Sequence, residues 1–101
     1  MLATTDIHSR LDEVRAKIAE ALRAVESDSG ASVVTAAVVG EFDSKGAKAE
    51  GAENARDAVI ELEQAADSAR VAAAADPGLG GAARESVEAA HLAICILKTE
   101  V

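Results

Sequence analysis

Residues 47–75 read AKAEGAENARDAVIELEQAADSARVAAAA and form the longest run in the chain without a strong helix breaker. Their apolar positions recur at alternating spacings of three and four, which places them on one side of a helix. These positions are Ala52, Ala55, Val59, Leu62, Ala66, Ala69 and Ala73. Pro77 ends the run, because the residue before a proline is disfavoured in helical geometry. The pattern predicts one helix over 47–75 with a narrow, alanine-rich contact face.

Two flanking segments show the same spacing and predict helices over 5–27 and 82–99. The first has Thr5 as its expected N-cap and a stripe of Ile7, Leu11, Val14, Ile18, Ala21 and Val25. The second has a stripe of Ala83, Val87, Ala90, Ile94, Leu97 and Val101. Leu92 and Ile96 add a second apolar side to it, so residues 92–97 are apolar nearly all round. We expect such a segment to be buried on more than one face.

Residues 31–51 are ambiguous. The β-branched residues between Val33 and Val39 favour a strand, whereas the alanines that separate them are at helical spacing. Because no other segment offers a partner strand, we interpret 32–42 as a helix. Gly40, Gly46 and Gly51 leave 40–51 open to three interpretations, namely a loop, a kink, or a weakly stable helix that continues into 47–75.

The segments together predict a single all-α domain over 1–101, either a helical hairpin or an antiparallel bundle of three to four helices. No exact internal repeat is present. The 101 residues include 23 Leu, Ile, Val and Phe against 25 Ala, and Phe42 is the one aromatic residue. A small domain with so few bulky groups buries little surface by itself. We therefore expect a homo-oligomer, a protein partner, or both.

The charge balance narrows the class of partner. The chain has 18 acidic and 10 basic residues and a net charge of −8, which disfavours nucleic acid and anionic membranes. No run reaches the length of a membrane span, and no signal peptide is visible. Cys95 is the single cysteine and fits a reducing compartment. We expect a cytoplasmic protein, with export by a non-classical route as the open alternative.

No enzyme and no cofactor are predicted. Cys95 lies in an apolar segment, where burial raises the pKa of a thiol and weakens it as a nucleophile. Residues 78–81 are glycine-rich, but they lack the preceding strand and the following lysine of a phosphate-binding loop.

Metal ligation is an alternative that rests on residues 88–95. Glu88 and His91 form a Glu-x-x-His pair, which in ferritin-like carboxylate proteins supplies two metal ligands. Here a dimer would have to complete the centre, with Glu61 or Glu63 as donors. His91 and Cys95 are four apart and could form half of a transition-metal site, with His8 as the other candidate. We prefer the interpretation of a surface glutamate, a boundary histidine and a structural cysteine.

The segment IHSRLDEVRA at 7–16, followed by alanine-rich helix, resembles small coiled-coil or hairpin proteins of high-GC actinobacteria. Some of those proteins are associated with type VII secretion or polymorphic-toxin loci. In size, acidity and helicity the chain is also similar to the WXG100-like helical hairpins. Residues 27–30, SDSG, stand where that family has Trp-x-Gly, and the tyrosine of its export signal is absent. The resemblance implies a helical hairpin and a secreted partner protein, and it assigns no site residue.

The sequence therefore predicts a non-enzymatic structural or protein–protein interaction module that works through its apolar stripes. The alternatives are a WXG100-like secreted partner and a dimeric, ferritin-like metal-binding half-bundle. The predicted interface residues are Ile7, Leu11, Val14, Ile18, Val59, Leu62, Val87, Ile94 and Leu97.

Overall fold

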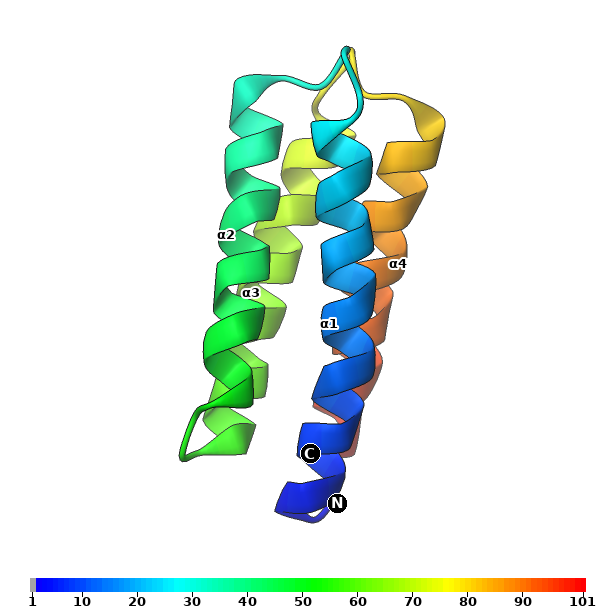
Figure 1. The fold of residues 1–101 in the computed structure, drawn as a ribbon. Helices are drawn as coiled ribbons and strands as arrows, with labels where there is room; N and C mark the ends of the chain where they lie inside the picture. The colour runs from blue at the N-terminus through cyan, green and yellow to red at the C-terminus, as the bar shows by residue number, and fades with distance from the viewer. Residues whose placement is uncertain (1) are drawn as a thin grey trace.

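The computed structural model describes residues 2–101, which form a four-helix bundle with an up-down-up-down order (Figure 1). The helices are α1 (Thr4–Glu26), α2 (Val33–Glu50), α3 (Ala55–Ala74) and α4 (Gly81–Glu100). Each helix packs on the next, α4 packs on α1, and the diagonal pair α1 and α3 is only weakly in contact. The bundle measures 41 × 19 × 18 Å. The predicted all-α fold class is confirmed.

The predicted ends of α1 and α4 lie within one residue of the observed ends. Thr5 as the N-cap of α1 was wrong. The helix begins at Thr4, and its N-cap residue Ala3 makes no side-chain capping bond.

One helix over 47–75 was also wrong. The chain leaves helical geometry between α2 and α3, at residues 51–54. Gly51 is the C-cap of α2, and the side chain of Asn54 accepts a hydrogen bond from the N–H of Asp57 to start α3. Such a side-chain cap satisfies a backbone donor that a helix start leaves free.

The ambiguous region is helical from Val33 to Glu50, so α2 continues through Gly40 and Gly46. Gly46 is buried, and a Cβ at this position would lie 3.3 Å from Cδ1 of Ile18. A glycine here lets α2 approach α1 closely, and this packing outweighs the low helix propensity of the residue.

The buried positions of the first hairpin recur in the second at a spacing of 48 residues. Bulky residues in one hairpin correspond to small ones in the other at several positions, so the two halves share the volume of the core. The α1 and α3 pairs are Ile7 and Ala55, Leu11 and Val59, Val14 and Leu62, Ile18 and Ala66, Ala21 and Ala69, and Val25 and Ala73. The α2 and α4 pairs are Thr35 and Ala83, Val39 and Val87, Phe42 and Ala90, Gly46 and Ile94, and Ala49 and Leu97.

The α1–α2 and α3–α4 loops meet at one end of the bundle (Figure 1), where two aspartates 48 positions apart bind each other's hairpin. Oδ2 of Asp28 accepts a hydrogen bond from the N–H of Gly80 at 2.7 Å, and Oδ2 of Asp76 accepts one from the N–H of Ser32 at 2.9 Å. Ser32 and Gly80 are the N-caps of α2 and α4. Each carboxylate thus lies at a helix N-terminus, where the helix dipole favours negative charge.

Asp76 is the more strongly held of the two aspartates. The hydrogen bond from the N–H of Ser32 and the bond of 2.7 Å from the hydroxyl of Thr35 lower the pKa of Asp76. The carboxylate is therefore ionised throughout the neutral range. It links the two hairpins at their loops.

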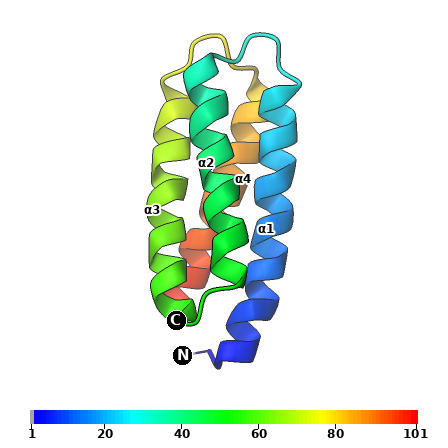
Figure 2. The same ribbon diagram turned by 60° about the vertical axis from the view of Figure 1, so that its left-hand side comes forward.

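The chain termini lie together at the other end of the bundle (Figure 2). The N–H of Leu2 donates to the carbonyl of Glu100 at 3.0 Å, and the guanidinium of Arg56 donates to the carbonyl of Leu2 at 2.9 Å. These bonds join the start of the chain to α3 and to the end of α4, so both ends of the bundle are closed by contacts between the hairpins.

Candidate functional site

All nine predicted interface residues lie in the core of the single chain, and none is more than 3% exposed. Within one copy they lie on α1, α3 and α4 and belong to one hydrophobic core. A partner of the folded chain must therefore contact mainly other residues, although Val14 reaches the wall of one groove.

The large apolar side chains that stay at the surface lie on α2, α3 and α4. Val33 and Val34 in the first turn of α2 are 86% and 67% exposed. Ile60 and Val71 on α3 are 42% and 58% exposed, and Leu92 and Ile96 on α4 are 59% and 46% exposed. Residues 92–97 were expected to be buried on several faces, and in the single chain the face that carries Leu92 and Ile96 is open.

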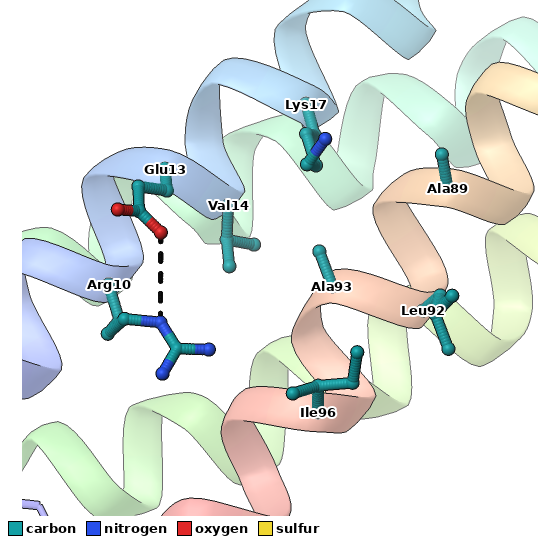
Figure 3. Close-up of a pocket in the computed structure, with 8 residues that line it drawn as sticks. All are labelled: Arg10, Glu13, Val14, Lys17, Ala89, Leu92, Ala93 and Ile96. Atoms are coloured by element: carbon teal, nitrogen blue, oxygen red, sulfur yellow. Dashed lines mark ion pairs between the residues drawn. The ribbon is translucent and has the colours of Figure 1, made fainter.

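A groove of about 310 Å³ lies between α1 and α4, next to this open face (Figure 3). We call it the α1/α4 groove. The α4 residues that line the groove are apolar, and the α1 residues that line it are charged except for one valine. The lining residues are Arg10, Glu13, Val14, Lys17, Ala89, Leu92, Ala93 and Ile96. This combination of an apolar wall with charged residues at the rim is typical of protein contact surfaces.

Arg10 is fixed at one end of the groove by two carboxylates. Its guanidinium lies 3.7 Å from Glu13 and 2.5 Å from Glu100. The hydrogen bond from Arg10 lowers the pKa of Glu100, and the same bond raises the pKa of Arg10. Both side chains of the Arg10–Glu100 pair are about one-third exposed, so solvent weakens the attraction between them.

A second groove, of about 410 Å³, lies between α2 and α3. It is lined by Ala37, Val38, Glu41, Lys45, Gln64, Ala65 and Ser68. Its apolar lining residues are smaller than Leu92 and Ile96 on α4, and Val38, the largest of them, is less exposed than either.

Three potential metal ligands meet on the surface formed by α3 and α4. Oδ1 of Asp67 lies 2.6 Å from Nε2 of His91, and Sγ of Cys95 lies 3.5 Å from the same nitrogen. One ligand atom from each residue lies within 4.8 Å of the other two. The side chain of Asp67 is 51% exposed and that of His91 is 19% exposed, so the group is open to solvent on one side. We call these three residues the Asp67–His91–Cys95 cluster.

The cluster differs in two respects from a Cys–His–Asp catalytic relay. Such a relay uses one imidazole nitrogen for the nucleophile and the other for the carboxylate, whereas here the shortest contacts of both partners are with Nε2. Burial, together with the charges of Glu63 and Asp67, raises the pKa of the Cys95 thiol. An activated nucleophile requires the opposite shift.

Of the residues predicted for a metal site, His91 and Cys95 lie together, and Asp67 joins them rather than Glu61, Glu63 or Glu88. Glu88 and Glu61 are exposed, and Glu63 lies 3.6 Å from Lys98. His8 is half-buried on α1 and does not belong to the cluster. Sequence reasoning found His91 and Cys95 from their spacing of four and missed Asp67, which lies 24 positions before His91 on another helix.

Comparison with protein-family models, curated proteins and solved structures finds no match to this chain. The resemblance to actinobacterial helical hairpins therefore stays a prediction. No helix within residues 2–101 is both long enough and apolar enough to cross a membrane.

Proposed function

We propose that this chain is a non-enzymatic interaction module that self-associates through α4 and the α1/α4 groove. One observation carries the proposal: Leu92 and Ile96 on the apolar wall of the groove stay 59% and 46% exposed, whereas Ala83, Val87, Ala90, Ile94 and Leu97 on the same helix are buried. Covering two large aliphatic side chains with a partner removes apolar surface from water, at about 25 cal/mol per Å².

The positions of the exposed apolar side chains suit a second copy in antiparallel orientation. Leu92 and Ile96 flank Ala93 on the α4 wall of the groove, and Arg10 lies near Ile96 (Figure 3). A twofold axis near Ala93 would bring Leu92 and Ile96 of one copy against the same side chains of its partner. Arg10 is already paired with Glu13 and Glu100, so the contact depends on these apolar side chains. Twofold dimers with such self-complementary surfaces are the commonest homo-oligomers.

The area of the proposed contact between the two copies determines how tightly we expect the dimer to bind. A helix of 20 residues, as α4 is, spans about 30 Å. A contact limited to this strip and the groove beside it buries on the order of 1,000 Å² in total, at the low end for specific interfaces. We therefore expect a weak dimer, with a dissociation constant on the order of micromolar to millimolar.

Light scattering coupled to size exclusion over a dilution series tests the proposal. Wild type should pass from dimer to monomer on dilution, and Ile96→Glu should be monomeric at every concentration with an unchanged melting temperature. Ile60→Glu is the matched control, because Ile60 is 42% exposed but lies on α3, and this variant should dimerise like wild type. A wild type that is monomeric at the highest concentration, or an Ile96→Glu variant that dimerises normally, contradicts the proposal.

A further inference from the structure

We propose that Asp67, His91 and Cys95 form a mononuclear site for a divalent transition-metal ion of the Zn²⁺ type, with a fourth position open to water. This site lies on the α3/α4 surface, and the inference does not depend on self-association through α4.

One distance within the cluster already matches tetrahedral coordination, and a second has to lengthen. At the usual Zn–S, Zn–N and Zn–O lengths, ligand atoms lie about 3.4 to 3.6 Å from one another. The distance of 3.5 Å between Sγ of Cys95 and Nε2 of His91 already meets this requirement. The contact of 2.6 Å between Asp67 and His91 has to lengthen by about 0.8 Å. Asp67 is half-exposed and has room for such a rotation.

The direction of the donors is a second observation in favour of a metal ion. Oδ1 of Asp67 and Sγ of Cys95 approach the same imidazole nitrogen from two helices. An ion between them would use the lone pairs of all three atoms, and thiolate, imidazole and carboxylate together make a donor set that Zn²⁺ accepts. His91 and Cys95 are one turn apart on α4, so the helix fixes their separation before any ion binds.

The surroundings leave a place for a fourth ligand. Glu63 is one turn before Asp67 on α3, and its charge acts on Cys95 together with that of Asp67. Arg70 and Lys98 are the positive groups that face the cysteine, and Lys98 is paired with Glu63 at 3.6 Å. Because Asp67 is exposed on the solvent side, water can complete the coordination without displacing this ion pair.

The cluster is not a consequence of the repeated core. The residues 48 positions earlier, in the first hairpin, are Ala19, Asp43 and Ala47. That hairpin is helical over the same positions with neither a histidine nor a cysteine there, so the fold does not require the three ligands.

Titration of the reduced full-length chain with Co²⁺ tests the site, because a bound thiolate gives a charge-transfer band and tetrahedral Co²⁺ gives strong visible bands. Zn²⁺ should displace Co²⁺ at one ion per chain and raise the melting temperature. Cys95→Ser should remove the charge-transfer band. Asp67→Asn and His91→Ala should each weaken binding at least tenfold. Circular dichroism establishes that each variant is folded.

Glu88→Gln and Asp43→Asn are the matched controls, and both should bind Co²⁺ like wild type. Loss of binding in Glu88→Gln with normal binding in Asp67→Asn would assign His91 to the Glu-x-x-His pair and overturn the proposal. Absence of the bands at a tenfold excess of Co²⁺ would do so too. Binding that depends on Cys95 alone would show a simple thiol adduct and would also overturn it.

Discussion

Replacing Gly30 with alanine should destabilise the bundle through a contact between two loops. A Cβ on Gly30 would lie 2.0 Å from the carbonyl oxygen of Gly78, and one on Gly78 would lie 2.2 Å from the carbonyl oxygen of Gly30. Neither glycine has a positive φ, so the requirement for glycine comes from the close approach alone. The Cα hydrogens point at the opposite carbonyls, as in Cα–H···O contacts between strands.

The size of the stability loss depends on which atoms can move to make room for the added Cβ. Overfilling a packed site costs about 1 to 3 kcal/mol when side chains rearrange around the added atoms. Here the obstacle is backbone, so the loops themselves must separate, which also lengthens the bonds from Asp28 to Gly80 and from Asp76 to Ser32. We expect a loss at the upper end, about 2 to 3 kcal/mol, and a melting temperature lower by roughly 10 to 20 °C.

Urea unfolding followed by far-UV circular dichroism measures this loss, because the chain has neither tryptophan nor tyrosine for fluorescence. The double variant of Gly30 and Gly78 should lose less than the sum of the single losses, since either methyl group alone separates the loops. Gly40→Ala is the control: a Cβ there meets nothing within 4 Å, so this variant should be more stable by about 0.5 to 1 kcal/mol. A Gly30→Ala variant with the wild-type midpoint, or additive losses in the double variant, would refute the loop contact.

Two further predictions concern Asp76 and Phe42. In the folded chain the pKa of Asp76 lies below its ordinary value of 3.8, so its stabilising effect is complete above that pH and is lost as the pH falls toward the lowered value. Asp76→Asn should therefore unfold at less urea than wild type at neutral pH, and the difference should narrow in acid; an equal difference at both pH values would contradict the assignment. Phe42 is fully buried, so Phe42→Ala should lower the free energy of unfolding by about 3 to 5 kcal/mol, and a loss below about 1 kcal/mol in the same assay would show that the core closes over the cavity.

The helical stripes were predictable because spacing alone determines which face of a helix is apolar. In α1 the six residues of the predicted stripe are the six buried residues, and they include bulky Ile, Leu and Val side chains. Alanine gives a weaker signal in residues 47–75, because it favours a helix without indicating where the helix starts. Gly51 and the side chain of Asn54 determine that start, and a single capping bond is a small signal within a long run of good helix formers.

The helix that packs against each apolar stripe could not be predicted from the residues of that stripe alone. A helix with an alanine face buries little alone, and we therefore expected contacts between chains. In the bundle Phe42 takes the position that corresponds to Ala90, and Ile94 takes the position that corresponds to Gly46. The bulk missing from one hairpin is thus supplied by the other. This correspondence depends on the register between hairpins, which a search for identical residues does not detect.

The Asp67–His91–Cys95 cluster could likewise not be predicted from one helix alone. Spacing within one helix brought His91 and Cys95 together, whereas Asp67 joins them only through the register of α3 against α4. Asp67 lies 24 positions before His91, so spacing within one helix does not connect it to the other two ligands.

Comparing residues 48 positions apart distinguishes the side chains that the fold requires from those that it does not require. Residues in contact recur at a spacing of 48 where the bundle depends on them, even with their charges exchanged: Arg15 pairs with Glu50 in the first hairpin, and Glu63 pairs with Lys98 in the second. The features behind our two proposals do not recur. Leu92 and Ile96 correspond to Ser44 and Lys48, and the cluster of metal ligands corresponds to two alanines and an aspartate.

The first hairpin folds with polar residues at the positions of Leu92 and Ile96, so the fold does not require aliphatic side chains there. These two side chains raise the apolar exposure of a single chain, which is unfavourable in water unless a partner covers them. A histidine and a cysteine at partly buried positions are likewise not needed by a helix that could carry alanine or aspartate, as α2 does. The exposed aliphatic pair and two of the three metal ligands lie on α4, and Asp67 lies on α3, so both proposals centre on α4 and the helix beside it.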